Sequence, residues 1–432
     1  MNKQILRLAI PNIISNLSVP LLGVVDTALV GHLDEVYYLG ALAVGSMIFN
    51  FLFWGFGFLR MGTTGLTAQA YGQRSRLNMI MILARVQIIA FSIGLLIFIL
   101  QKPIADLSFK IIQSGADVET YSRIYFNIRI LTAPAVLALY GINGWFLGMQ
   151  NAKYPMIVTI FLNLLNVVLN IWFIWYMGMN VEGVAWGTVI STYLALLLAL
   201  FLFRKKYKKY TEHYVNRELL NLEELKRYFS VNRDIFIRTI CLIFTFSFFT
   251  AKSAEQGDLI LAANSILLQL WMVASYGIDG FAYAAESLVG KFKGRLDIDN
   301  LKRAVYYNMT WGLVLGFSGS LIYFIFDDLI LAFFTDKSNV IQLAKSVILW
   351  TVAAPLVSSF CYIWDGVFIG ATATVPMRNS MLVSTLIVFL PTYYVATEFI
   401  GIHGLWLAMI MFMITRGVLL TLFAKSHIFE TS

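Results

Sequence analysis

Long apolar runs recur from one end of this sequence to the other, and they constrain the fold more than any other feature. About 20 apolar residues in a helix cover the hydrocarbon core of a bilayer, and runs of that length appear throughout the chain. The runs are continuous, whereas the strands of a transmembrane barrel alternate between apolar and polar residues. The sequence therefore predicts an all-α polytopic membrane protein with twelve transmembrane helices. The expected spans are residues 6–31, 39–71, 79–100, 120–150, 155–177, 183–203, 232–251, 259–290, 304–326, 340–372, 379–397 and 402–424.

Charge alternates between successive loops of the expected helices. Basic residues such as Arg74 and Arg76 fall on one side, and acidic residues such as Glu182 fall on the other. The positive-inside rule then predicts a multi-pass protein of the cytoplasmic (cell inner) membrane with both termini in the cytoplasm. The net charge of +8 is explained by this topology and by contact with membrane lipids, so it does not indicate a nucleic-acid partner.

A basic polar segment, residues 204–231, divides the chain into an N-terminal lobe, 1–203, and a C-terminal lobe, 232–432. We interpret this segment as a cytoplasmic linker, although a basic cluster at a membrane edge is also typical of a lipid-binding or regulatory site. Its part NRELLNLEELKRYF is expected to form a short amphipathic helix on the membrane surface.

The two lobes resemble copies of one another. The motif Gly144-xxx-Gly148 in the first lobe matches Gly366-xxx-Gly370 in the second, about 220 residues further along the sequence. Six spans per copy is an even number, so both copies have the same orientation in the membrane. A parallel internal repeat of this kind is suited to alternating-access transport, with the substrate path at the interface of the repeats.

A carboxylate, Asp26, lies inside the first expected span. A charge at that depth costs at least about 2.5–3.5 kcal/mol, so Asp26 must face protein or water, or be protonated. We interpret Asp26 as a proton-sensitive switch in a transporter. Pro11 and Pro20 in the same span allow it to bend, either as a hinge or as a static kink.

Three asparagines of the fifth span, Asn163, Asn166 and Asn170, are spaced so that they share one helical face. Counting along the spans gives Asp26, Asn170 and Thr188 similar depths. The asparagine face is therefore expected to hydrogen-bond the carboxylate. The alternative is that these side chains only hold helices together, since such contacts contribute about 0.6–2 kcal/mol without any transport role.

A second polar group is expected deeper toward the cytoplasm. Three interpretations stay open: an ion-pair lock between the halves involving Arg60 and Asp279, a coupling-cation site at Asp365 or Asp279, or structural anchoring. Its members lie in the inner halves of their spans: Arg60, Arg238, Asp279, Glu286, Asp365 and Arg416.

Motifs for catalysis and metal binding are missing from the sequence. The four histidines form no metal-ligand spacing, Cys241 and Cys361 are isolated, and there is no phosphate-binding loop or nucleophile elbow. We expect no enzymatic activity, no cofactor and no metal site.

Several segments resemble the multidrug and toxic compound extrusion (MATE) family and, within it, the DNA-damage-inducible protein F branch. They are FWGFGFLRMGTTGLTAQAYG (53–72), ILAANSILLQLWMVASYGIDGFAYAAESLVGKFKG (260–294) and PNIISNLSVPLLGVVDTALVGHL (11–33). The resemblance covers essentially all twelve spans. It implies a cation-coupled exporter in which two six-helix lobes form a V-shaped central cleft and move by rocker-switch alternating access.

The resemblance also implies roles for individual residues. Asp26 matches the family's first-helix carboxylate and Pro11 the proline at its bend, while Asn166 and Thr188 match polar members of the N-lobe network. Asn170 departs from the pattern, because some relatives have a second aspartate there. With one carboxylate left in this lobe, H⁺ ranks before Na⁺ as the coupling ion.

Asp365 resembles a tenth-helix aspartate that is implicated in cation binding in another branch, but the glutamate expected on the seventh span is absent. Sodium-coupled export through Asp365 is therefore an alternative. A second alternative is a flippase for lipid-linked precursors. The first-ranked function is proton-driven export, by a monomer, of bulky amphipathic compounds that are cationic or neutral, because 15% aromatic residues suit a large apolar cleft.

Overall fold

The computed structural model describes residues 1–33 and 35–430, and all regular secondary structure in this part of the chain is helical. Twelve helical stretches within it are long and apolar enough to span a membrane, which confirms the predicted fold class and number of spans. They are Asn2–Val30, Val36–Gly72, Arg76–Ile99, Ala116–Gly148, Lys153–Tyr176, Val181–His213, Asn216–Glu255, Asp258–Gly294, Ile298–Ile325, Ser338–Gly370, Thr374–Ile400 and Ile402–Phe429.

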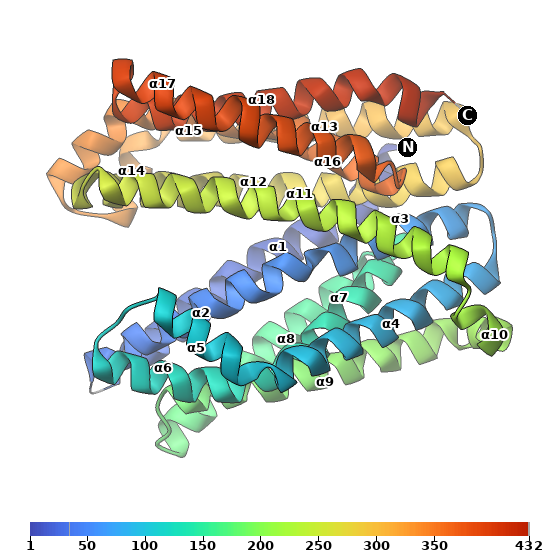
Figure 1. The fold of residues 1–432 in the computed structure, drawn as a ribbon, viewed down its shortest axis with the longest axis horizontal. Helices are drawn as coiled ribbons and strands as arrows, with labels where there is room; N and C mark the ends of the chain where they lie inside the picture. The colour runs from blue at the N-terminus through green and yellow to red at the C-terminus, as the bar shows by residue number, and fades with distance from the viewer. Residues whose placement is uncertain (34, 431–432) are drawn as a thin grey trace. The chain divides into compact units, whose positions relative to one another are not determined.

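Figure 1 draws the helices of the first six spans in blue to green. Their elements are α1 (Asn2–Val30), α2 (Val36–Trp54), η1 (Gly55–Gly57), α3 (Phe58–Gly72), α4 (Arg76–Ile99), α5 (Gln101–Ile111), α6 (Ala116–Arg129), η2 (Ile130–Thr132), α7 (Ala133–Gly148), α8 (Lys153–Ile171), η3 (Trp172–Tyr176), α9 (Val181–Tyr207) and η4 (Lys208–His213). Two of these spans are interrupted by a tight turn, Val36–Gly72 by η1 and Ala116–Gly148 by η2.

The last six spans are formed from residue 216 onward, and one of them, Thr374–Ile400, is interrupted by a wide turn. Their elements, with the short α10 before them, are α10 (Asn216–Leu219), α11 (Leu222–Glu255), α12 (Asp258–Gly294), α13 (Ile298–Ile325), α14 (Asp327–Phe334), α15 (Ser338–Gly370), α16 (Thr374–Leu382), η5 (Val383–Phe389), α17 (Leu390–Ile400), α18 (Ile402–Ala424) and η6 (Lys425–Phe429).

The chain forms two compact units, Ile14–Leu225 and Met1–Ile13 with Lys226–Ser432. We call them the N-unit and the C-unit. The boundary lies inside α1, so the first thirteen residues group with the C-terminal helices: Ala9 and Ile13 of α1 approach Gly280 of α12 so closely that a side chain there would collide with them. The first helix is therefore shared between the units.

In the N-unit, α7 crosses α3 at two glycines. A Cβ atom on Gly144 would lie 2.4 Å from the carbonyl oxygen of Arg60, and one on Gly148 would lie 2.8 Å from that of Thr64. Only glycine permits an approach this close, and closely packed glycines are typical of helix pairs in membranes.

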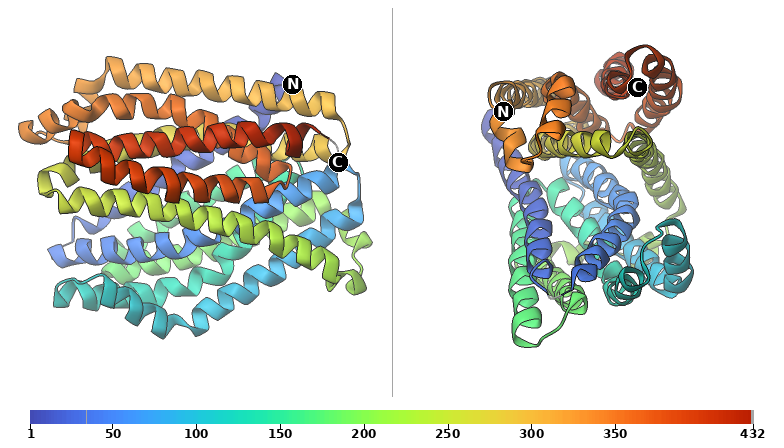
Figure 2. Two further views of the ribbon diagram at one scale, coloured as in Figure 1. Left: turned by 45° about the horizontal axis from the view of Figure 1, so that its top comes forward. Right: turned by 90° about the vertical axis from the view of Figure 1, so that its left-hand side faces the viewer.

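The C-unit repeats this crossing between α15 and α12. A Cβ on Gly366 would lie 2.3 Å from the carbonyl oxygen of Ala282, and one on Gly370 would lie 2.5 Å from that of Glu286. Gly366 follows Gly144 by as many residues as Ala282 follows Arg60. Other packing is repeated as well, since α4 packs on α7 as α13 packs on α15, and α8 packs on α9 as α17 packs on α18. The last of these pairs is drawn in red in Figure 2, where α17 and α18 run side by side. The predicted internal repeat is thus present in the packing of both units.

The connection between the halves differs from the expectation. Only residues 216–219 form a separate short helix, and α11 begins at Leu222 and continues without a break into the seventh span. The predicted surface helix is therefore wrong in its second part. The apolar periodicity of the segment continues into the span, so the sequence contains no stop signal between them.

Candidate functional site

Asp26 on α1 is half-buried and lies against α8 in the N-unit. The Nδ2 atom of Asn170 donates a hydrogen bond of 2.7 Å to Asp26 Oδ1. Asn170 is fully buried, with none of its surface exposed. The carboxylate thus faces a protein partner, as its position in an apolar span requires.

The hydrogen bonds continue from this pair into α9. Asn170 Nδ2 also donates to Asn166 Oδ1 at 2.9 Å, and Asn166 Nδ2 donates to Thr188 Oγ1 at 3.1 Å and Ser191 Oγ at 3.5 Å. The Thr188 hydroxyl donates in turn to the carbonyl oxygen of Val184 at 2.9 Å. Asp26 is therefore one end of a polar chain that joins α1, α8 and α9.

Asn163 forms a second link between α1 and α8. Its Nδ2 donates to Ser18 Oγ at 2.9 Å, two helical turns before the contact between Asn170 and Asp26. The order of the two contacts means that α1 and α8 run in the same direction. Asn163, Asn166 and Asn170 are all buried on one face of α8, as their spacing predicts.

Within this hydrogen-bonded network, one side-chain atom of Asn170 lacks a partner among the described residues. Asn170 Oδ1 is buried and accepts no hydrogen bond from any described residue. It faces Gly187 of α9, where a Cβ would lie only 1.9 Å from it. The wide turn η3 begins two residues after Asn170, and such π-helical segments are frequent at functional sites. A buried acceptor without a donor is costly. Asn170 Oδ1 can therefore accept one further hydrogen bond.

The inner charged group lies in the C-unit. Asp365 Oδ2 accepts hydrogen bonds from Arg416 Nη2, at 2.5 Å, and from Arg238 Nη2. The three side chains come from α15, α18 and α11, and each is at least nine-tenths buried. With one carboxylate and two guanidinium groups, this triad carries a net positive charge.

Arg60 and Asp279, the two residues of the predicted lock, belong to different units. Arg60 is a half-buried residue of α3 in the N-unit, and Asp279 is a half-buried residue of α12 in the C-unit. Asp365 has both of its partners in its own unit. The lock between Arg60 and Asp279 stays a prediction, as does the bend at Pro11.

Two arginines inside apolar spans were missed by sequence reasoning, the half-buried Arg129 and the buried Arg85. Arg129 of α6 donates to the Tyr125 hydroxyl at 2.5 Å and lies over the ring of Phe49. Arg85 of α4 donates to the carbonyl oxygen of Glu218 at 2.6 Å and so fixes the connection between the halves. The signal that could have found them is the one that identified Asp26, a charge inside an apolar span.

Comparisons with known proteins agree with this architecture. The family model MatE matches residues 11–172 and again 235–395. The chain is 38% identical to DNA damage-inducible protein F of Escherichia coli (strain K12), over 99% of this chain and 92% of that protein. It is 24% identical to Protein DETOXIFICATION 44, chloroplastic, of Arabidopsis thaliana, over 96% of this chain and 80% of that protein.

A solved structure has the same fold. It is an outward-facing conformation of a multidrug resistance MATE family transporter of the MOP superfamily, with a TM-score of 0.88. The sequences are 18% identical, and the match covers 99% of this chain and 95% of that one. The two matches of the MatE model fall on the two halves of the chain, as the repeated packing of the two units requires.

Proposed function

This chain belongs to the MatE family, and from that membership and the site around Asp26 we propose that it is a proton-coupled multidrug exporter. Its substrates are bulky amphipathic compounds that are cationic or neutral. Asp26 is the group that binds the coupling proton, and its protonation changes how α1 packs. The basic loops face the cytoplasm, so Asp26 lies toward the outer side.

The observation that supports this proposal is the unmatched acceptor beside Asp26. When ionised, Asp26 accepts a hydrogen bond from Asn170 Nδ2, and Asn170 Oδ1 has no donor. A protonated Asp26 can itself donate a hydrogen bond. The amide oxygen of Asn170 can accept this bond once the amide rotates. Proton binding therefore replaces one arrangement of the pair by another instead of merely removing a charge.

The consequence of that change is mechanical, because Asp26 lies on the helix shared by both units. On the N-terminal side of Asp26, α1 is held to α8 by the contact between Ser18 and Asn163. The unit boundary follows Pro11 by two residues, and proline removes a backbone hydrogen bond that would stiffen the helix. A rearranged contact at Asp26 frees the part of α1 that follows residue 13 to bend relative to the first thirteen residues.

The transport cycle follows from these steps. In the outward-facing state Asp26 binds a proton, its contact with Asn170 is remade, and the new packing of α1 lowers the affinity for substrate. The protein returns to the inward-facing state and releases the proton to the cytoplasm. Substrate and proton are thus bound in alternation, which is the condition for antiport.

The C-unit triad supports H⁺ over Na⁺ as the coupling ion. A sodium site at Asp365 needs a carboxylate whose charge is available to a cation, but this carboxylate already contacts Arg238 and Arg416. The net positive charge of the triad repels a second cation. The sodium-coupled alternative would require both guanidinium groups to move away first.

The test is substrate-dependent proton flux in proteoliposomes, with wild type compared with Asp26→Asn. Asparagine keeps the shape of the side chain but cannot bind the proton, so we expect export driven by a pH gradient to fall at least about tenfold. Asp117→Asn is the matched control, because Asp117 is an exposed carboxylate of α6 in the same unit. Proton-driven export retained in Asp26→Asn would refute the switch.

A second arm of the same experiment replaces the proton gradient by a sodium gradient. We expect no export under sodium alone, in wild type or in Asp117→Asn. Export that follows sodium and is abolished by Asp365→Asn in correctly folded protein would favour the alternative site. Family membership would be unaffected by either result.

A further inference from the structure

A pocket of about 350 Å³ lies in the C-unit, and none of its lining residues belongs to the triad at Asp365. It is formed where three helical segments begin or end: the start of α11, the turn before α16 and the end of the chain in η6. Its volume is within the range of small-molecule sites in proteins. The lining residues are Arg227, Ser230, Val231, Asp234, Thr372, Ala373, Thr374, Val375, Pro376 and His427.

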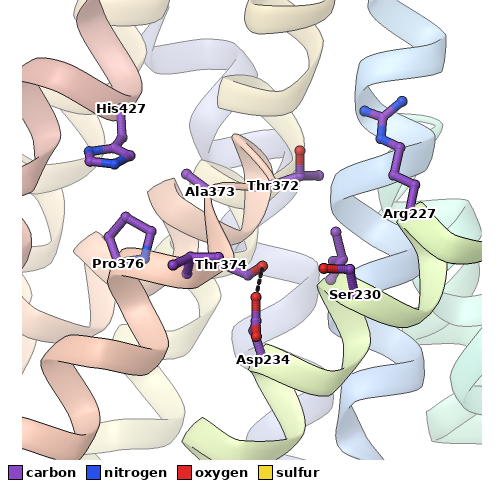
Figure 3. Close-up of a pocket in the computed structure, with 10 residues that line it drawn as sticks. Arg227, Ser230, Asp234, Thr372, Ala373, Thr374, Pro376 and His427 are labelled. Carbon is purple, nitrogen blue, oxygen red and sulfur yellow. Dashed lines mark hydrogen bonds between the residues drawn. The ribbon is translucent and has the colours of Figure 1, made fainter.

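Asp234 is the one carboxylate of this lining, and its charge is already compensated. It is fully buried and accepts hydrogen bonds from Arg378 Nη1 at 2.8 Å, Arg233 Nη2 at 3.3 Å and Thr374 Oγ1 at 3.0 Å. The contact with Thr374 is drawn in Figure 3. These bonds fix α11 to the start of α16. Asp234 therefore builds the pocket but does not repel an anion from it.

The remaining polar side chains of the pocket are donors or basic groups. Arg227 and His427 lie on opposite sides of it, with the turn at Thr372 and Ala373 between them (Figure 3). Lys293 Nζ donates to the carbonyl oxygen of His427 at 2.8 Å, which places a further ammonium group beside the pocket. Among the charged groups named here, four cations thus accompany the one carboxylate of Asp234, even with His427 neutral.

The hydroxyl groups of Ser230 and Thr372 complete this donor set. A guanidinium group, an imidazole and two hydroxyls line this one pocket. Together they match the oxygens of a phosphate better than those of a carboxylate, because a phosphate offers three or four acceptors. The chemistry of the lining thus favours a ligand with more than two acceptor oxygens.

From this arrangement we infer that the pocket binds a phosphate-bearing anion, through Arg227, His427 and the two hydroxyls. The ends of membrane-spanning helices lie at the level of lipid headgroups, and basic groups there attract anionic lipids. The same donors would hold a soluble phosphate. The site is separate from the proton site of the N-unit and does not depend on the proposed function.

The experiment measures two probes on the purified full-length protein. Retention of phosphatidylglycerol against phosphatidylcholine, counted by native mass spectrometry after release from mixed-lipid nanodiscs, tests a headgroup. Titration with inorganic phosphate, followed by calorimetry, tests a soluble anion. The variants are Arg227→Gln, His427→Gln and the two combined. Lys302→Gln, which removes an exposed charge of α13 outside the pocket, is the matched control.

We expect Arg227→Gln to weaken binding about fivefold for whichever of the two probes the wild-type protein binds. One basic group near a membrane surface contributes about that factor to the binding constant. The combined variant weakens it further, and Lys302→Gln leaves it unchanged. Loss confined to the lipid probe identifies a headgroup, and loss confined to phosphate identifies a soluble ligand. Ser230→Asp adds a carboxylate to the same pocket and should abolish binding in either case.

Two results would overturn the inference. One is that wild-type protein binds neither probe in preference to its control. The other is that Arg227→Gln and Lys302→Gln weaken binding equally. The anion would then be attracted by the basic surface in general and not by this pocket. Both variants change exposed side chains, and a thermal unfolding curve for each confirms that folding is intact.

Discussion

The two units share a helix crossing but not a carboxylate. In each unit a pair of glycines packs against the backbone of a neighbouring helix, through Gly144 and Gly148 in one and Gly366 and Gly370 in the other. The residue before the first glycine is asparagine in the N-unit and Asp365 in the C-unit. In the N-unit, an acidic residue inside an apolar span lies instead on α1, as Asp26. Duplication has therefore kept the packing and changed the chemistry.

In our proposal only Asp26 binds the coupling proton, and the different surroundings of the two carboxylates support this assignment. Asp365 contacts two guanidinium groups, and a proton on it would leave two buried cations without an anion. Asp26 contacts the amide of Asn170, which can either donate or accept. The same residue type thus serves as a fixed ion-pair partner in the C-unit and, in our proposal, as a switch in the N-unit.

The largest expected effect comes from neutralising the carboxylate of the triad. Asp365→Asn leaves Arg238 and Arg416 buried without their counter-ion, and breaking a buried ion pair from one side costs about 3–5 kcal/mol. We expect a large decrease in the thermal unfolding temperature of the purified protein.

Asp26→Asn is the contrasting variant for this measurement. It keeps a polar partner for Asn170 and removes no ion pair, so its unfolding temperature should stay close to that of wild type. Equal destabilisation by the two substitutions would mean that both carboxylates are structural, and the contrast between the units would fail.

Much of the fold could be predicted because membrane insertion imposes a strong pattern. Twelve apolar runs gave twelve spans, and repeated glycines such as Gly144 and Gly366 indicated the duplication. The start of α11 could not be predicted, because the amphipathic segment before the seventh span continues its helical period into it. The division of α1 between units depends on packing against α12, which leaves no local signal.

The second prediction concerns the shared crossing. Gly144→Ala and Gly366→Ala each place a Cβ less than 2.5 Å from a backbone carbonyl oxygen, which the helix cannot move aside cheaply. Overpacking of this kind costs about 1–3 kcal/mol, so both variants should unfold at lower temperature by similar amounts. If one of the two variants unfolded at the wild-type temperature, the two crossings would differ in how closely the helices pack. The repeat would then be less exact than the packing indicates.

The site was predictable to the extent that periodicity and charge define it. The spacing of Asn163, Asn166 and Asn170 indicated one face, and a depth count brought Asp26 and Thr188 close to it. Partners that are small or belong to another helix were missed. Ser18 and Ser191 look like ordinary residues of an apolar span, and Gly187 matters only because of what it faces.

The third prediction tests Asn170 Oδ1, the acceptor beside Asp26 that has no donor among the described residues. In Gly187→Ala the new Cβ would lie 1.9 Å from Asn170 Oδ1, so the amide must turn away and its bond to Asp26 is weakened. We expect a loss of about 1–2 kcal/mol in stability and a weaker pH dependence of transport. Gly23→Ala on α1 is the matched control, because nothing lies within 4 Å of its Cβ. A normal pH dependence in Gly187→Ala would separate Asn170 from proton coupling.

The smallest expected effect separates holding α1 in place from sensing the proton. Asn163→Ala removes only the bond to Ser18, and single polar contacts between membrane helices contribute about 0.6 kcal/mol. Its stability should fall by about that amount, while the pH dependence of export stays that of wild type, because Asn163 has no hydrogen bond to Asp26. Asn170→Ala removes an amide of the same kind from the same face of α8 and should change the pH dependence. If the two alanine variants behaved alike in transport, the asparagine face would act only as a contact between helices, and the coupling role would have to be sought elsewhere in the N-unit.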